Sequence, residues 1–241
     1  MKAFLLAAGH GTRLRPYTDI TAKCLLPVCG VPMLEIWFAL SRRFGISDML
    51  VNTHAHAVEV KEFVRGWRAG VRVTVVEEPE LHGSAGTLRV NRDWIQGEDK
   101  FWVFYADVLT NVNLGAMLGS HVPRRVATLG LYSVPDPERC GIATLAGDGT
   151  VMEFVEKSPH PKGNLAFAGL MLATPELLGA IPQRAGADIA FDVIPRLLGR
   201  IHGYQIPEFV MDIGTIENYH LAQKIWPGIQ DPVAVNHDPA H

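Results

Sequence analysis

Residues 2–16 read KAFLLAAGHGTRLRP, and this stretch carries the clearest local pattern of the chain. Residues 2–8 are apolar except for Lys2, a pattern that predicts a buried strand. The strand runs directly into Gly9 and Gly11, where the lack of side chains would let backbone N–H groups approach an anion closely. We therefore expect the first core strand of an α/β domain, followed by a tight glycine-rich turn.

Strand-like and helical patterns alternate along most of the remaining chain. Apolar, β-branched and aromatic runs predict strands, and apolar residues at helical spacing predict helices between them. Such alternation favours a mostly parallel sheet that is covered on both faces. The predicted fold class is α/β, a Rossmann-like three-layer α/β/α domain with a mostly parallel mixed central sheet. The predicted strands lie at 48–53, 71–76, 101–106 and 126–134, and the predicted helices at 32–44, 58–67, 175–181, 191–198 and 216–226.

The middle of the chain breaks this alternation. Two short strand-like runs, 141–145 and 150–156, flank the dipeptide Asp148-Gly149, which is typical of hairpin turns. A third strand with small residues is predicted at 165–173. We expect a small antiparallel β insertion beside the main sheet, placed to form a second wall of a cleft.

Length and composition limit the domain organisation, the binding partners and the cellular compartment that we expect. The 241 residues fit one large α/β domain, which we assign to 1–226, with a loosely held tail at 227–241. The 22 Lys and Arg against 25 Asp and Glu give a net charge of −3, which argues against a nucleic-acid partner bound by bulk positive charge. No apolar run reaches the roughly 18 residues that identify a membrane span, so we expect no membrane partner. Three cysteines without zinc-site spacing favour free thiols in a reducing cytoplasm.

Two arginines stand next to the glycine-rich turn. A P-loop would need Gly-Lys-Ser/Thr at its end, and a dinucleotide fingerprint would need a third glycine where Leu14 stands. A bare pair of glycines is as readily a tight exit from a strand as a ligand loop. Arg13 and Arg15 favour phosphate recognition, because a guanidinium group fits phosphate oxygens with two parallel hydrogen bonds.

One lysine and two aspartates stand in apolar surroundings. Lys23, close to a phosphate loop, could neutralise a phosphoryl group during transfer, although a lone lysine is usually a solvated surface residue. Asp107 follows the predicted strand 101–106, and Asp212 interrupts an apolar run before Gly214. Mg²⁺ prefers one or two carboxylates together with substrate phosphates. Each aspartate alone is at least as readily a turn former or a helix N-cap.

Residues 5–16, followed by KCLLPV at 23–28, resemble the signature of the sugar-1-phosphate nucleotidylyltransferases. The resemblance extends over residues 1–226. It implies that a nucleoside triphosphate and a sugar 1-phosphate react by in-line displacement to an NDP-sugar and pyrophosphate, with Mg²⁺ as cofactor. It also implies that the β insertion forms the sugar side of the cleft.

The resemblance further implies which residues form the site. Residues 78–88 are similar to the loop that reads the base, although His82 and Ser84 depart from the pattern of many relatives, as does Ala106 before the first aspartate. Glu156 would bind sugar hydroxyls and Lys157 the sugar phosphate. The implied residues are Arg13 and Lys23 for catalysis; Asp107 and Asp212 for the metal; Ala8, Gly9, Gly11, Thr12, Glu78, Gly83, Ser84, Ala85 and Gly86 for the nucleotide; and Glu156, Lys157, Asn164 and Gly169 for the sugar phosphate.

The base and the sugar are a finer question. Residues 77–86 and the segment PERCG at 137–141 look most like mannose-1-phosphate guanylyltransferases, so GTP with mannose 1-phosphate or a similar sugar is the predicted pair. Uridylyl- or thymidylyltransferases that act on glucose 1-phosphate are the alternative.

Two other classes stay open. A glycosyltransferase of similar architecture would normally carry an Asp-x-Asp motif, and Asp107-Val108-Leu109 lacks the second aspartate. A non-catalytic sugar-nucleotide-sensing regulatory subunit should have lost part of the catalytic and metal-binding set, whereas all four of those residues are present. We therefore predict an enzyme, and we leave a homodimer open.

Overall fold

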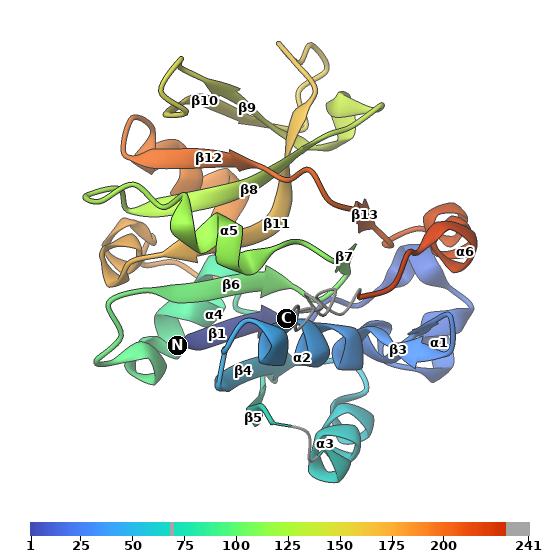
Figure 1. Cartoon of the computed structure of the whole chain (residues 1–241). Helices are drawn as coiled ribbons and strands as arrows, with labels where there is room; N and C mark the ends of the chain where they lie inside the picture. The colour runs from blue at the N-terminus through green and yellow to red at the C-terminus, as the bar shows by residue number, and fades with distance from the viewer. Residues whose placement is uncertain (68–69, 230–241) are drawn as a thin grey trace, which may run out of the picture.

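A nine-stranded mixed sheet forms the centre of the protein (Figure 1). The structure, a computed structural model, describes residues 1–67 and 70–229. The strands are β1 (Lys2–Leu6), β2 (Pro27–Val28), β3 (Val31–Pro32), β4 (Asp48–Thr53), β5 (Arg72–Glu77), β6 (Phe101–Tyr105), β7 (Val108–Thr110), β8 (Ala127–Ser133), β9 (Gly141–Leu145), β10 (Val151–Glu156), β11 (Leu165–Ala173), β12 (Ile201–Gln205) and β13 (Val210–Asp212). The order in the large sheet is β10-β9-β11-β6-β1-β4-β5, and β8 pairs with both β11 and β12.

Helices of different lengths cover this sheet. The α-helices are α1 (Tyr17–Ile20), α2 (Met33–Arg43), α3 (Ala57–Gly66), α4 (Ser84–Val90), α5 (Leu114–Gly119) and α6 (Ile216–Ile225). Shorter 3-10 turns occur at Thr12–Leu14, Lys23–Leu25, Arg92–Ile95, Pro137–Arg139, Pro175–Ala180 and Ile194–Leu197, and a π-helical turn at Ile189–Val193. The helices predicted at 175–181 and 191–198 are therefore 3-10 and π-helical turns in the structure. The predicted fold class is confirmed.

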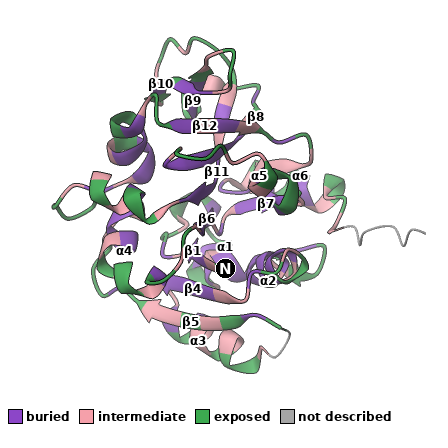
Figure 2. Ribbon diagram, turned by 60° about the vertical axis from the view of Figure 1, so that its left-hand side comes forward, coloured by how far each residue is buried: buried purple, intermediate pink, exposed green. Residues whose placement is uncertain are grey.

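The parallel strands bury both of their faces, because successive side chains in a strand point to opposite sides. Ala3 and Leu5 of β1 belong to one core cluster with residues of α2, α3 and α5, and Phe4 belongs to a second cluster with residues of α4 and of the helical turns. In Figure 2 the buried colour follows the inner strands, whereas no residue of the edge strand β5 is buried. This arrangement is the predicted three-layer α/β/α architecture.

The hairpin of β9 and β10 extends the main sheet and is not a separate layer beside it. The reason lies in β11, which bends at Gly169, where φ is 66° and the pairing register with β8 shifts. Beyond the bend, residues from Leu170 pair with β6, while before the bend Ala166 pairs with Ile142 of β9. The two parts of β11 therefore join the hairpin to the central strands.

A smaller pair of strands joins two distant parts of the chain. β7 and β13 are antiparallel, with Asp212 opposite Val108, and the N–H of Ile213 donates to the carbonyl of Asp107 at 3.0 Å. Leu14 of the glycine-rich turn packs in the same apolar cluster as Ile213. Folding of this cluster therefore brings Asp107 and Asp212 to the turn.

The end of the described chain packs against the domain. Asn111 Nδ2 donates to the carbonyl of Gly228 at 3.2 Å, and Ile229 contacts both the cluster beneath α6 and the core cluster that contains residues of α2, α3 and α5. The predicted tail at 227–241 otherwise lies outside the described residues. Within residues 1–67 and 70–229, no helix combines the length and apolarity that crossing a bilayer requires.

Phe104 provides a test of this core. Its ring lies 4.6 Å from that of Trp37 and 5.6 Å from that of Trp102, and it is fully buried. We expect Phe104→Ala to lower the free energy of unfolding by about 3–5 kcal/mol, because it removes buried apolar surface and leaves a cavity. Urea unfolding measures this. Val155→Ala, at a side chain on β10 that is 41% exposed, should change it by less than about 0.5 kcal/mol. An equally small effect at Phe104 would contradict the packing.

Candidate active site

Two neighbouring cavities open where β1 and β6 end, the edge toward which the β6 arrow points in Figure 1. The first has a volume of about 260 Å³. The second has a volume of about 560 Å³. Tyr105 and Asp107 line both cavities, so the two spaces meet at the end of β6. Ligands of open α/β sheets bind at this edge.

The first cavity contains most of the residues expected to bind a nucleotide. The backbone that leaves β1 forms part of its wall, and the loop before α4 forms another part. The predicted residues that line it are Ala8, Gly9, Lys23, Glu78, Gly83, Ser84 and Asp107.

A buried hydrogen-bond network holds the first cavity in shape. The carboxylate of Glu78, which is 1% exposed, accepts from Asn52 Nδ2 at 2.9 Å, Thr87 Oγ1 at 2.6 Å and the N–H of His82 at 3.1 Å. Asn52 Oδ1 in turn accepts from the N–H of Ala7 at 2.7 Å. The network therefore ties the glycine-rich turn to the loop before α4, and the Glu78 carboxylate is already engaged within it.

Ala187 fixes the start of α4. Its carbonyl oxygen accepts from the N–H of Ala85 at 3.0 Å and from that of Gly86 at 3.1 Å. Neither Ala85 nor Gly86 lines either cavity. Gly83 has φ 80°, and a Cβ there would overlap the Ala187 carbonyl oxygen, so this position requires glycine. These contacts hold the loop before α4 against Ala187, which precedes the π-helical turn.

The second cavity gathers residues from distant parts of the chain. Most of the predicted catalytic, metal and sugar residues meet here, on a wall completed by β10 and β11. The predicted residues that line it are Arg13, Asp107, Glu156, Lys157, Gly169 and Asp212.

Four charged side chains converge between the cavities. Lys23 Nζ donates to Asp107 Oδ2 at 2.6 Å, and Asp212 Oδ1 accepts from the N–H of Gly214 at 2.5 Å. A Cβ built at Gly214 would lie 2.6 Å from Asp212 Oδ1. This Cβ would also lie 3.0 Å from Arg13 Nη2 and 3.3 Å from Lys23 Nζ. Glycine at this position therefore leaves the space in which these groups approach one another.

The surroundings of Asp212 disfavour its charged form. Burial raises the pKa of Asp212 above its usual range, and the neighbouring Asp107 raises that pKa further, while Lys23 and Arg13 oppose the shift. Two carboxylates that repel each other beside a cavity form an oxygen donor set that fits Mg²⁺. Among the residues that the structure describes, no group of three or more His, Cys, Asp or Glu could hold a metal ion. Bound phosphates and water are the further ligands that Mg²⁺ takes in such sites.

Glu156 and Lys157 both face the second cavity, although neighbouring side chains of a strand usually point to opposite sides. Lys157 has φ 51°, so the chain leaves the extended form at this residue. Its Nζ lies 3.7 Å from Glu156 Oε1. Burial raises the pKa of Glu156, and Lys157 opposes this. A Cβ at Gly141 would overlap Glu156 Oε2, so glycine there makes room for the carboxylate.

Three further predicted residues lie outside both cavities. Gly11, with φ 65°, shapes the turn after β1, and the exposed Thr12 begins the following 3-10 turn. Asn164 is exposed and precedes β11. Arg15, the second arginine of the turn, pairs at the surface with Asp19 at 3.1 Å. Arg13 is thus the arginine of the turn that reaches the site.

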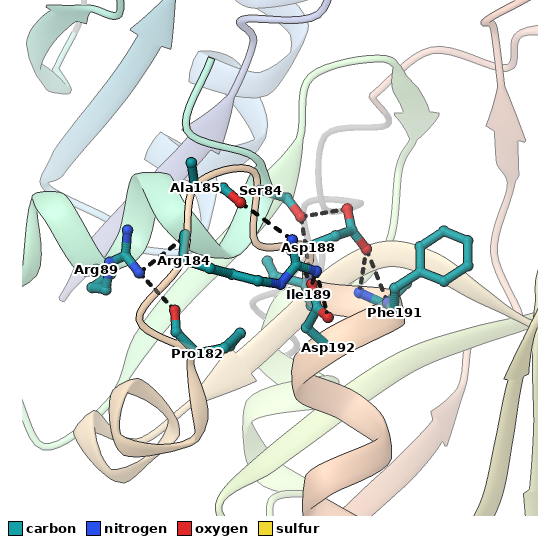
Figure 3. A network of polar contacts seen from close by, with 10 residues as sticks. Ser84, Arg89, Pro182, Arg184, Ala185, Asp188, Ile189, Phe191 and Asp192 are labelled. Atoms are coloured by element: carbon teal, nitrogen blue, oxygen red, sulfur yellow. Dashed lines mark hydrogen bonds and ion pairs between the residues drawn. The ribbon is translucent and has the colours of Figure 1, made fainter. Parts of the chain in front are cut away.

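Sequence patterns do not single out Asp188, which lines the second cavity. Its carboxylate accepts from Ser84 Oγ at 2.8 Å and from the N–H groups of Ala190 at 2.8 Å and Phe191 at 3.0 Å, as Figure 3 shows. An aspartate before an apolar run is an N-cap pattern, which signals a helix start and no ligand. Asp188 links the loop of the first cavity to the wall of the second.

Other lining residues were also missed. Asn52 carries a signal, since it is a polar residue near the end of a predicted apolar strand, whereas the aromatic residues resemble ordinary core positions. The lining residues that sequence reasoning missed include Asn52, Leu81, Thr87, Tyr105, Tyr132, Arg139, Cys140, Phe167, Asp188 and Phe191.

Curated relatives share much of this chain. It is 36% identical over 186 residues to a glucose-1-phosphate thymidylyltransferase of Streptomyces griseus, which covers 75% of this chain and 51% of that protein. It is 30% identical over 223 residues to a mannose-1-phosphate guanylyltransferase of Mycobacterium tuberculosis, which covers 90% of this chain and 62% of that protein. The chain thus spans between half and two thirds of the length of these relatives.

A solved structure and a family model agree with these sequence similarities. A Bacillus anthracis crystal structure, described as a glucose-1-phosphate thymidylyltransferase in complex with sucrose, superimposes with a TM-score of 0.86 at 26% identity, covering 96% of this chain and 97% of that one. The family model described as Nucleotidyl transferase matches residues 2–226. Because this match spans nearly the whole described chain, the protein belongs to the nucleotidyl transferase family, as its motifs predict.

Proposed function

We propose that the protein joins a nucleoside triphosphate and a sugar 1-phosphate, and releases pyrophosphate and an NDP-sugar. The observation that carries this proposal is the convergence of Arg13, Lys23, Asp107 and Asp212 where the two cavities meet. A reaction between two phosphate-bearing substrates needs adjoining binding sites and positive charge at their junction. The named activities of the relatives support the same reaction class.

In this reaction an oxygen of the sugar phosphate attacks the α-phosphorus of the triphosphate. A P–O bond forms there as the bond to the β-phosphate oxygen breaks, and pyrophosphate leaves. The attacking phosphate is already an anion, so no general base is needed, and catalysis rests on positioning and charge neutralisation.

The charged side chains divide this work. Arg13 stabilises the charge that develops on the leaving pyrophosphate. Lys23 balances the α-phosphate, and its hydrogen bond to Asp107 keeps the ammonium group in place. Lys157 holds the sugar phosphate, and the half-buried Glu156 accepts from sugar hydroxyls.

We assign Mg²⁺ to Asp107 and Asp212. When bound, it would neutralise charge on the reacting phosphates. The raised pKa of Asp212 supports this assignment, because a cation there would offset the burial of the carboxylate, which is the main cause of the shift, and would also relieve the repulsion by Asp107.

For the substrate pair we propose GTP and mannose 1-phosphate, with thymidylyl or uridylyl transfer to glucose 1-phosphate as the alternative. The mannose-1-phosphate guanylyltransferases among the relatives support the first pair, and the thymidylyltransferase supports the second. We also propose a cytoplasmic location, and a homodimer stays open.

A pyrophosphate-release assay with Mg²⁺ tests the proposal. It would combine GTP, UTP, dTTP, ATP and CTP with the 1-phosphates of mannose, glucose, N-acetylglucosamine and heptose. We expect the highest rate for GTP with mannose 1-phosphate. No release from any combination, together with tight nucleotide binding in calorimetry, would instead support a sugar-nucleotide-sensing subunit.

Arg13→Ala tests the role at the leaving group. We expect kcat to fall by an amount that corresponds to about 2.7–4 kcal/mol, as for the loss of one preorganised donor elsewhere. Steady-state kinetics with the best substrate pair measures this. Arg92→Ala, at an exposed arginine on the 3-10 turn after α4, is the matched control and should leave kcat unchanged. Near-normal turnover of Arg13→Ala would rule out the assigned role.

Asp107→Asn tests the metal site. We expect the Mg²⁺ concentration for half-maximal activity to rise by at least about tenfold. Residues that only hydrogen-bond to a metal ligand typically contribute about 10–100-fold to metal affinity, so the loss of a ligand itself should cost at least as much. Titration of activity with Mg²⁺ measures this. Asp93→Asn, at a side chain that is 95% exposed, is the matched control. An unchanged Mg²⁺ titration in Asp107→Asn would count against this ligand.

A further inference from the structure

Phe191 presents an apolar ring to the second cavity. The residue is 57% exposed and lines that cavity but not the first one. Among the described residues, no other phenylalanine or tryptophan belongs to the exposed class. Isolated apolar residues on a surface need no explanation. An exposed aromatic ring that lines a cavity with charged groups, however, offers an apolar contact to a ligand in that cavity.

The chain around Phe191 holds this ring away from the core. Asp188 accepts from the N–H of Phe191 at 3.0 Å, and Ser84 Oγ accepts from the N–H of Ile189 at 2.8 Å. Ile189 and Val193 at the ends of the π-helical turn are fully buried. Figure 3 shows the Phe191 ring pointing away from this network. The exposed position of the ring is therefore fixed by the backbone, and π-helical turns occur often at functional sites.

Charged groups share this cavity with the ring. Lys157 Nζ lies 5.8 Å from the centroid of the ring, within the range of a cation–π contact. Glu156 and Asp188 line the same cavity. The ring is thus an apolar platform next to a cation and two carboxylates.

We propose that Phe191 is a specificity-determining residue on which the pyranose ring of the sugar 1-phosphate stacks. A pyranose has C–H groups on its faces and hydroxyls around its edge, so stacking covers a face while the edge remains free for hydrogen bonds to Glu156. The phosphate then lies within reach of Lys157. This inference rests on the proposed function, since it names the residue of that site that recognises the sugar ring.

Three variants and two KM values test the proposal. Phe191→Leu keeps an apolar side chain without a flat ring, Phe191→Tyr keeps the ring, and Met152→Leu alters a side chain on β10 that is 55% exposed and lines neither cavity. We expect Phe191→Leu to raise the KM for the sugar 1-phosphate about three- to tenfold, in keeping with the loss of one aromatic contact, with an unchanged KM for the triphosphate and an unchanged Tm. Phe191→Tyr should keep the sugar KM below that of Phe191→Leu, because it retains the flat ring, and Met152→Leu should match the wild type.

Inhibition by inorganic phosphate separates stacking from an indirect effect through Lys157. Phosphate has no sugar ring, so its inhibition constant against the sugar 1-phosphate should be the same in the wild type and in Phe191→Leu. An equal rise in that constant and in the sugar KM would mean that Phe191 only holds Lys157, and would overturn the stacking proposal. An unchanged sugar KM in an active Phe191→Leu enzyme would overturn it as well.

The wild-type assay keeps the two proposals distinguishable. If the wild type shows no turnover, the proposed function fails, and calorimetric titration with mannose 1-phosphate and glucose 1-phosphate then tests Phe191 by itself. Weaker binding to Phe191→Leu than to the wild type would support the platform. Equal binding, or no binding of either sugar phosphate to the wild type, would overturn it.

Discussion

The parallel pairing of β1 with β6 is the constraint on which the rest of the site depends. Leu6 is opposite Tyr105, and the N–H of Ala106 donates to the carbonyl of Leu6 at 3.0 Å. Both strands therefore end at the same edge of the sheet. The glycine-rich turn follows β1 there, and Asp107 follows β6. Because parallel strands share their carboxyl ends, any ligand that contacts one of these segments also meets the other.

Close approach is the second recurring constraint. Gly214 leaves room for three charged groups, Gly141 leaves room for the Glu156 carboxylate, and Gly83 lets the loop before α4 contact the Ala187 backbone. In each case a methyl group would occupy space that a functional group or a backbone carbonyl now fills. The shape of both cavities thus depends on missing side chains as much as on the side chains that line them.

Hydrogen bonds also connect the two cavities directly. Ser84 belongs to the loop of the first cavity and donates to Asp188, which caps the π-helical turn on the wall of the second. The ends of this hydrogen bond are 104 residues apart in the chain. The same turn carries Phe191, so the loop of the first cavity also supports the ring that we propose as a sugar platform.

Local patterns were enough to predict the alternating elements, the turn after β1 and a set of charged candidate residues, because periodicity and short motifs are local properties. It could not show that the N–H groups of Ala85 and Gly86 are taken by Ala187, that Asn164 lies outside the cavities, or that Asp188 enters one. Those facts depend on strand order, on the bend of β11 and on the pairing of β7 with β13. Only tertiary structure decided them, since a local pattern reports which residues are buried but not which distant residue they meet.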